Sequence, residues 1–276
     1  MHRATLPTVD LEITSWGSGV LRVEEVAAAD HGDPGHGSPS PLRCQPIVRL
    51  ARREGGPVTQ TQTRWNPRRL TAVAVDLPPG VTPAGTRGRI LHAALKLFAE
   101  YGFFGASIRD IGREVGINPA TLYAHYPAKE HILAELIQLG HEELRRRMRQ
   151  AAADAGPDPA DQLAALVRAQ VLVHTEYPLL ALVANHELHA LSPDAAAPAL
   201  ALREEARQLL LTVLDRGVAE GAFDVPDVGL AGIAIGSLGL RVANWFGPDQ
   251  PYTRDQVADA YVGFALRLAG RPLPRG

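Results

Sequence analysis

Apolar residues recur at helical spacing through most of the chain after residue 86, and this recurrence predicts a series of helices. The first is predicted from Thr86, whose hydroxyl can cap free backbone N–H groups. It is predicted to end at Gly102, which can take the left-handed backbone of a C-terminal cap. Five residues are predicted to share its inner face: Ile90, Ala94, Leu97, Phe98 and Tyr101.

Two short helices joined by a tight turn are predicted next. Ser107 and Asp110 have the spacing of a capping box, and this helix is predicted to end at Gly116. Asn118 then caps a third helix that starts with Pro119, a residue that loses no hydrogen bond at that position. Four residues are predicted to point inward: Ile108, Ile111, Val115 and Ile117. This is the bihelical unit that lays its second helix in the DNA major groove.

The remainder of the chain is predicted to be all-helical. After a fourth helix at about 128–151, further helices are expected at about 160–175, 178–190, 198–221, 228–246 and 253–268. The helix at 228–246 is apolar nearly all round its first half, so it is predicted to be buried. The last two helices are predicted to form a homodimer interface, because a two-fold copy hides an apolar surface most simply. The alternative is that they complete the core of a monomer.

Composition and charge agree with a DNA-binding protein. The chain has 276 residues, of which 46% are apolar, enough for a core. Between Thr86 and Lys129 six basic residues face three acids, whereas from Ala151 onward nine arginines face fifteen acids. A basic head on an acidic body indicates that only the head touches DNA. The arginine-rich run at 145–149 is expected to complement a helix dipole instead.

The sequence also predicts where the protein resides. It contains no uninterrupted apolar stretch of about 18 residues, so no membrane span is expected. The amino terminus lacks a signal peptide's basic start followed by an apolar run. Cys44 is the single cysteine and cannot form an internal disulfide, which fits a reducing compartment. A cytoplasmic protein is predicted.

The predicted three-helix head resembles the TetR family of bacterial transcriptional regulators. Twelve positions of mixed chemistry carry the resemblance: Phe98, Gly102, Ser107, Ile111, Gly116, Ile117, Thr121, Leu122, Tyr123, His125, Tyr126 and Lys129. The chain is predicted to divide into three segments: an extension at 1–85, a DNA-binding domain at 86–131 and an effector-binding and dimerisation domain at 132–276. One departure is Ala128, which stands where the family often has a hydroxyl residue, so the cap of the fourth helix is weaker.

The DNA contacts follow from chemistry and from this resemblance. Ser107 and Lys129 sit at helix starts, where a hydroxyl, an ammonium and free N–H groups can hold phosphates. Thr121 can reach a base edge. Arg87 and Arg89 suit a narrow minor groove, although both could also be solvated surface. The predicted DNA-binding residues are Arg87, Arg89, Ser107, Asn118, Pro119, Ala120, Thr121, Tyr123, His125, Tyr126 and Lys129.

The extension at 1–85 has no sustained periodicity and is rich in glycine and proline, so it is predicted to be mostly disordered. Strand-like alternation at 11–26 and 70–77 could form a weak hairpin. In the resembled family the first helix usually lies close to the chain start. One hypothesis is therefore a misassigned start, with the natural chain beginning at Val81, since valine codons can initiate translation in bacteria.

The body is expected to bind a small effector. Its segments at 185–188, 191–194, 217–223 and 244–248 look like those of TetR regulators that answer to acyl-CoA or related lipid metabolites. A cavity lined by small aliphatic residues would favour an apolar ligand. Arg241 is predicted on a buried helix, where it needs an anionic partner, either a ligand or an internal acid. Asn244, His174 and His186 are the other candidate ligand residues.

These features predict a ligand-responsive regulator that binds double-stranded DNA as a homodimer, without a cofactor. A repressor is favoured, because a dimer on a promoter blocks polymerase without further contacts; an activator, or a non-lipid ligand, is the alternative. A metal-dependent enzyme using His186 and His189 is a distant alternative, since their spacing is not that of zinc proteases and no nucleophile motif appears. The length of the body argues against a purely architectural DNA protein.

Overall fold

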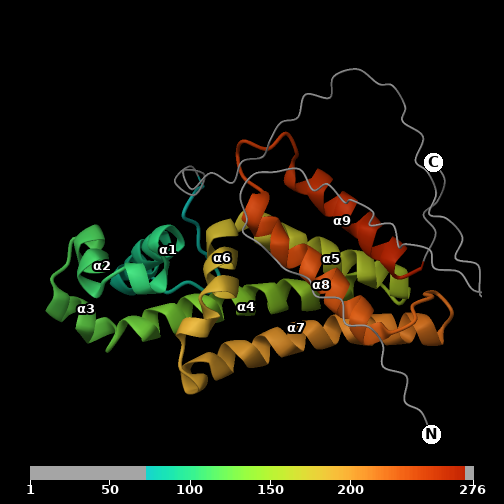
Figure 1. Cartoon of the computed structure of the whole chain (residues 1–276), viewed down its shortest axis with the longest axis horizontal. Coiled ribbons are helices and arrows are strands. Elements are labelled where there is room, and N and C mark those ends of the chain that lie inside the picture. Colours follow the sequence, from blue (N-terminus) through green and yellow to red (C-terminus); the bar gives the residue numbers. More distant parts are fainter. Residues whose placement is uncertain (1–72, 271–276) are drawn as a thin grey trace, which may run out of the picture. The chain divides into compact units, whose positions relative to one another are not determined.

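The computed structural model describes residues 73–270, which form helices and no strands. This confirms the predicted all-helical fold. The helices, shown in Figure 1, are α1 Gly85–Gly105, α2 Ile108–Val115, α3 Pro119–His125, α4 Lys129–Asp154, α5 Pro159–Glu176, α6 Pro178–His186, the short 3-10 helix η2 Leu188–Ala190, α7 Pro193–Ala219, α8 Val228–Trp245 and α9 Arg254–Leu268.

Helices α1, α2 and α3 form a three-helix head beside the start of the long helix α4 (Figure 1). The body is built around α5, which packs against α4, α7, α8 and α9. Helix α6 contacts both α1 and α4, so it lies against the head and the body at once. The core of the head continues into α6, because Leu180 and Val183 belong to the same apolar cluster as Ile90 and Phe98. Helix α4 and helix α6 therefore connect the two parts.

Helix α1 differs from its prediction at both ends. Its N-cap is Ala84, which makes no side-chain hydrogen bond, so the predicted cap at Thr86 is wrong. The Thr86 hydroxyl instead accepts a hydrogen bond from Arg89, 3.2 Å away. Gly102 does take a left-handed backbone, with φ of 72°, but the chain re-enters a helical turn after it. Tyr101 falls at this break and is 57% exposed, so its predicted place on the inner face is wrong.

The segment just before α1 packs onto the protein. Leu77 is 7% exposed and belongs to the core shared by the head and α6, and Pro78 is also buried. The carbonyl oxygen of Val75 lies 3.2 Å from Nδ1 of His92, and the Thr82 hydroxyl donates to the carbonyl of Pro78 at 2.7 Å. Residues 1–85 were predicted to be mostly disordered; within that range the structure describes 73–84, where Leu77 and Pro78 are buried against the core. The strand-like stretch at 11–26 and Cys44 lie outside the described residues.

Leu77→Ala should lower the free energy of unfolding by about 2–3 kcal/mol, because it removes a buried leucine side chain from the core. Chemical denaturation of the full chain measures this. The neighbouring exposed Asp76 supplies the control, since Asp76→Ala should change stability by less than about 0.5 kcal/mol. Equal stability of the two variants would mean that this segment contributes nothing to the core.

A chain starting at Val81 would lack Leu77 altogether, and intact mass of the protein made from its own promoter tests that start.

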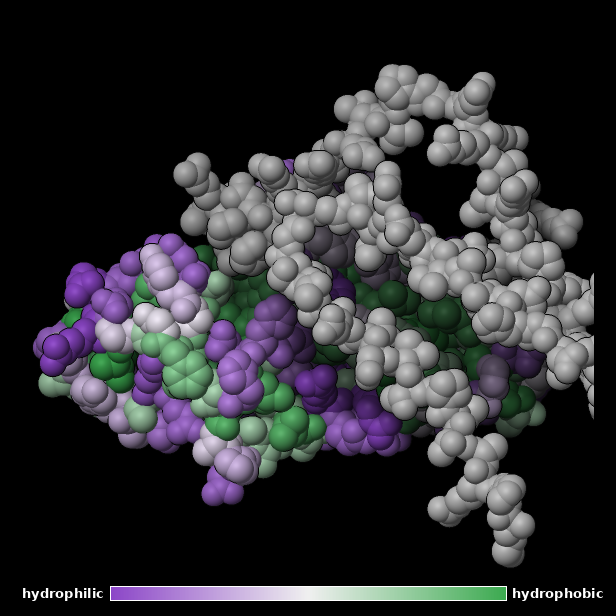
Figure 2. Space-filling model, in the orientation of Figure 1, coloured by the Kyte–Doolittle hydropathy of each residue, from purple (hydrophilic) through white to green (hydrophobic). Residues whose placement is uncertain are grey.

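Helix α8 is only half buried, which corrects the prediction that it is buried all round. One side packs closely on the body: a Cβ added to Gly232 or Gly239 would lie within 2.5 Å of Leu211 or Gln170. On the other side Leu230 is 66% and Ile233 63% exposed. Figure 2 shows mainly hydrophilic surface toward the α2–α3 end and apolar surface over the body in the region of α8.

Helix α8 also meets the length and composition of a membrane span, with only 28% of its residues buried. A single such helix is weak evidence for a membrane, because core helices of globular proteins pass the same test. Helix α9 adds to this surface with Phe264, 44% exposed, and Leu268, 47% exposed. The last two helices therefore leave an apolar surface open in one copy of the chain, and we name it the α8–α9 face.

Candidate DNA interface and effector cavity

The start of α2 is fixed by a reciprocal pair of hydrogen bonds. The Ser107 hydroxyl oxygen accepts from the backbone N–H of Asp110 at 3.2 Å, and the Asp110 carboxylate accepts from the backbone N–H of Ser107 at the same distance. The predicted capping box is confirmed. These bonds from Ser107 stabilise the ionised carboxylate and lower the pKa of Asp110 below its usual value. Helix α2 ends at Gly116, where the turn begins. Gly116 has the predicted left-handed backbone, with φ of 75°.

The turn positions α3 through its first residues. Oδ1 of Asn118 accepts from the backbone N–H of Thr121 at 2.8 Å and from the Thr121 hydroxyl at 3.1 Å, and Pro119 occupies the first helical position, as predicted. The turn passes close to α2, since a Cβ added to Gly112 would lie 3.1 Å from the Ile117 carbonyl oxygen. Helix α3 is thus held at a fixed angle to α2, as a recognition helix requires.

One side of α3 is anchored and the other is open. Leu122 is completely buried in the core, whereas Tyr123 is 50% exposed and Pro119, Ala120 and His125 are exposed. Tyr126 was predicted among the DNA contacts, but the structure places it in the core at 2% exposure. Burial raises the pKa of its hydroxyl well above the usual value. Tyr126 is therefore buried, and it is not part of the exposed surface formed by the other predicted DNA contacts on α3.

The two arginines at the start of α1 have different surroundings. The Arg87 guanidinium donates to both carboxylate oxygens of Glu135 on α4, the shortest distance being 2.6 Å, and lies 5.0 Å from the centre of the Tyr126 ring. Its hydrogen bonds to Glu135 raise the pKa of Arg87 further above its usual value. Arg87 therefore joins α1 to α4 in this state. Arg89 is exposed and donates to the nearby Thr86 hydroxyl, so it remains open to DNA.

Lys129 was predicted to hold a phosphate with its ammonium, but that group is engaged inside the protein. Its Nζ donates to the carbonyl oxygens of Phe103 at 2.6 Å and Ala106 at 2.7 Å, and lies 4.1 Å from the centre of the Phe103 ring. Desolvation lowers the pKa of Lys129. The start of α4 has Ala128 as its N-cap and no side-chain cap, as the sequence indicated. Lys129 ties α4 to the end of α1, and only its backbone N–H faces the helix start.

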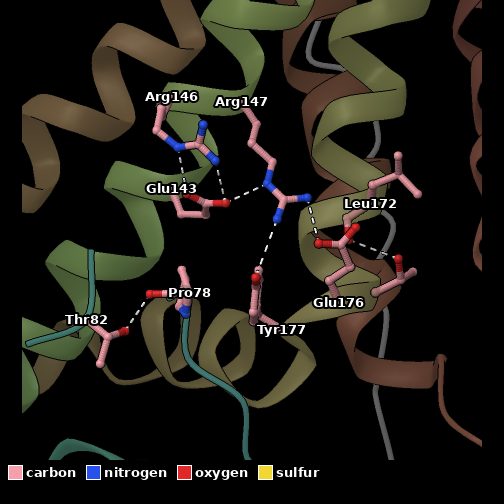
Figure 3. A network of polar contacts seen from close by, with 9 residues as sticks. Pro78, Thr82, Glu143, Arg146, Arg147, Leu172, Glu176 and Tyr177 are labelled. Atoms are coloured by element: carbon pink, nitrogen blue, oxygen red, sulfur yellow. Dashed lines mark hydrogen bonds and ion pairs between the residues drawn. The ribbon is translucent and has the colours of Figure 1, made fainter. Parts of the chain in front are cut away.

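The arginine-rich run on α4 forms ion pairs rather than complementing a helix dipole (Figure 3). Arg146 and Arg147 both donate to the carboxylate of Glu143, and Arg147 also pairs with Glu176 on α5 at 2.6 Å. Burial pushes the pKa of Glu143 upward, but the bonds from the two arginines outweigh it, and the pKa lies below its usual value. Arg145 bridges to Glu205 on α7. The run therefore fastens α4 to the body, away from any DNA.

A small cavity of about 20 Å³ lies where α4, α5 and α6 meet. His174, one of the predicted ligand residues, lines it and is 2% exposed. His141 lines the same cavity at 4% exposure, and its Nε2 has no hydrogen-bond partner among the described residues. Desolvation, with smaller effects of Arg203 and His174, lowers the pKa of His141 to about 4. Sequence reasoning missed His141, because no motif marks a single histidine on a long helix.

The other predicted ligand residues do not gather at this cavity. Arg241 was predicted on a buried helix but is exposed, because the outer side of α8 is not covered in one copy of the chain. Nδ2 of Asn244 lies 3.4 Å from Nε2 of His186, so these two residues pair at the end of α6. His189 turns its Nδ1 to the carbonyl oxygen of His186. Between residues 73 and 270 no group of three or more potential metal ligands occurs.

Two polar or aromatic contacts add to the packing of α6 between the head and the body. A carboxylate oxygen of Glu130, in the first turn of α4, accepts from the backbone N–H of Ser192 at 2.7 Å, just before α7. This bond lowers the pKa of Glu130. The rings of Phe104 and His189 lie 6.4 Å apart, which brings the end of α1 beside η2. A rearrangement of the body near α6 and α7 therefore reaches the head directly.

A rigid two-helix reader with an open recognition face, carried on a helical body, defines a helix-turn-helix DNA-binding regulator. Residues 90–136 match the family described as bacterial regulatory proteins, tetR family, and residues 156–269 match the tetracyclin repressor-like C-terminal domain. The chain belongs to the TetR family of transcriptional regulators. The relatives it matches are transcriptional regulators and not enzymes.

Individual relatives show how far the similarity extends. The repressor KstR2 of Rhodococcus jostii is 29% identical over 195 residues, which are 68% of this chain and 95% of the relative. The solved structure of the regulator PfmR from Thermus thermophilus is 33% identical with a TM-score of 0.61, covering 68% of this chain and all of that one. AibR, solved with isovaleryl coenzyme A and operator DNA, is 24% identical with a TM-score of 0.59, covers 63% of this chain and 95% of that one, and shares the fold.

Proposed function

We propose that the protein is a dimeric repressor that leaves its operator when a small effector binds in the body. The observation that carries this proposal is the open face of α3, held at a fixed angle by the capping bonds of Ser107 and Asn118. KstR2 is named a transcriptional repressor, and this supports repression rather than activation. The DNA contacts proposed are exposed or partly exposed residues of the head together with backbone N–H groups at the helix starts. They are Arg89, Ser107, Asn118, Pro119, Ala120, Thr121, Tyr123 and His125.

The homodimer is proposed to form through the α8–α9 face. Both helices expose apolar side chains, whose burial away from water is favourable. A copy related by a two-fold axis supplies the same apolar side chains for them to pack against. Two copies carry two readers, so the operator is expected to be a near-palindrome with half-sites about 34 Å apart or more. Such a protein acts where the DNA is, and we place it in the cytoplasm.

The effector is proposed to act through α4. The cavity around His141 lies in the middle of α4, whose first turn is tied to the head by Lys129 and to α7 by Glu130. A ligand that separates α4 from α6 there would tilt the head. An apolar or acyl-CoA-type molecule is the proposed effector class, because aliphatic side chains form part of the cavity wall, among them Leu144, Val173 and Leu180. The complex of AibR with isovaleryl coenzyme A supports this class only through the shared fold.

A gel shift of the purified protein on the DNA upstream of its own gene, with long-chain acyl-CoA titrated in, tests the proposal. A salt-sensitive shift that acyl-CoA releases is the expected result. A shift that persists at saturating acyl-CoA would support the DNA reader and reject the effector class. A protein that raises transcription from this DNA in a reconstituted assay would be an activator, contrary to the proposal.

A further inference from the structure

The cavity between α4, α5 and α6 is small and contains buried polar atoms without partners among the described residues, which folded proteins rarely tolerate. Its volume of about 20 Å³ is room for one water molecule or one small functional group. Leaving a buried polar group without a partner costs about 1–3 kcal/mol. The unpartnered atoms therefore indicate what the cavity is built to receive.

Asn185 offers a hydrogen-bond acceptor. Its Nδ2 donates to the carbonyl oxygen of Ala181 at 2.8 Å, which fixes the orientation of the amide because a carbonyl can only accept. Oδ1 is therefore the free atom, and it is buried without a partner among the described residues. A group that only accepts hydrogen bonds would face this oxygen unfavourably.

The two histidines are neutral and add a donor site and an acceptor site. Nδ1 of His174 lies 2.8 Å from the carbonyl oxygen of Gln170, so it carries the proton and its Nε2 is left as an acceptor. Nε2 of His141, which has no partner in the described part of the chain, can donate in the matching tautomer. Desolvation lowers the pKa of both rings, so neither brings a positive charge to the cavity near neutral pH.

The charged groups around the cavity are already satisfied. Glu143 lines it, but its carboxylate is held by Arg146 and Arg147, and Arg147 is shared with Glu176. Arg203 of α7, which also acts on His141, is exposed and does not line the cavity. A carboxylate or phosphate entering here would lose its hydration beside Glu143 without gaining a free cation.

We propose that this cavity is the polar end of the effector pocket and that it binds a hydroxyl group on an otherwise apolar molecule. A hydroxyl both donates and accepts, so it can donate to Oδ1 of Asn185 or Nε2 of His174 and accept from Nε2 of His141. A ketone or a carboxylate can only accept. The inference rests on the proposed function, because it assigns the chemistry of the effector's buried end.

The apolar remainder of such a molecule would have to pass between α4 and α6. These helices touch at Gly140, where an added Cβ would lie 3.2 Å from Cβ of Ala184 and 3.4 Å from Cγ of Leu180. A chain attached to the bound hydroxyl would have to part this contact. Separation of α4 from α6 at Gly140 is the movement that releases the head in the proposed function.

Three ten-carbon probes of equal length test the proposal: 1-decanol, 2-decanone and decanoate. Binding to the full-length protein is measured by thermal shift and by equilibrium dialysis. We expect 1-decanol to bind at least about tenfold more tightly than the other two, since only it satisfies both kinds of free atom. His141→Phe should remove this preference and raise Tm, because the buried unpartnered nitrogen is gone. Asn185→Leu should also remove the preference.

The control is His131→Phe, the same substitution at an exposed position on the same helix, which should leave the preference for 1-decanol unchanged. Circular dichroism confirms that each variant is folded. The proposal is overturned if wild-type protein does not bind 1-decanol, if decanoate or 2-decanone binds as tightly, or if His141→Phe keeps the preference. Operator gel shifts with acyl-CoA distinguish this inference from the proposed function. Wild-type protein that binds the operator and is released by acyl-CoA upholds the proposed function even where the preference for 1-decanol is absent.

Discussion

Ile233→Glu is expected to convert the dimer to a monomer and to lower operator affinity by at least about 100-fold. Ile233 is 63% exposed on the α8–α9 face, so a glutamate there is tolerated in a single chain. In the dimer the same carboxylate would be buried in an apolar contact and would face its own copy, which costs several kcal/mol. A monomer keeps one reader and loses the gain in affinity that two linked readers provide. Sedimentation and a gel shift measure both effects.

Leu200→Glu is the matched control. Leu200 is 45% exposed but lies on α7, outside the α8–α9 face, so this variant should remain a dimer and bind the operator normally. If Ile233→Glu stayed dimeric with unchanged affinity, the interface would lie elsewhere and α8 would be covered by something other than a second copy.

Tyr123→Ala is expected to weaken operator binding by about 10–100-fold without loss of stability. The Tyr123 side chain is 50% exposed on α3, whereas the core of the head relies on the adjacent Leu122. Each reader would lose one contact worth about 1 kcal/mol, and the dimer loses two. Gel shift titrations measure the affinity, and thermal unfolding checks the stability.

Phe104→Ala provides a comparison for this variant, since Phe104 is 76% exposed on the head but lies beside η2 and away from α3. It should leave operator affinity within about twofold of wild type, the size of an average surface substitution. A Tyr123→Ala protein that bound as tightly as Phe104→Ala would show that α3 does not approach the DNA backbone at this residue.

The reader could be predicted from sequence because its geometry depends on neighbouring residues. A capping box needs only Ser107 and Asp110, and the turn needs only the backbone freedom of Gly116 and the side chain of Asn118. These interactions act within four residues of one another. The sequence positions alone therefore fix them. Periodicity was less exact in the body, where α7 begins at Pro193 instead of 198, with Pro198 inside the helix, and α6 ends at His186 instead of 190.

The errors share a different origin. Tyr126, Lys129 and Arg241 were assigned to DNA or ligand from residue type and helix position, yet their surroundings come from distant segments. Tyr126 lies beneath Arg87, and Lys129 reaches carbonyls about 25 residues earlier in the chain. Periodicity identifies an apolar side of α8 but cannot say whether the chain itself or a second copy covers it. His141 could not be found from sequence for the same reason, since helices distant in the chain bury it.

The bonds of Lys129 to the carbonyls of Phe103 and Ala106 couple the movement of the head to that of α4. They lock the end of α1 to the first turn of α4, so the head and that turn move as one block. Lys129 lies eleven residues from Gly140, which is about 16 Å along a helix. A tilt of about 5° at Gly140 would displace Lys129 by about 1.5 Å, and α3, further from the pivot, by more. In the proposed dimer, an ångström-scale change around His141 would therefore be transmitted along α4 and would move each copy of α3 out of register with its half-site.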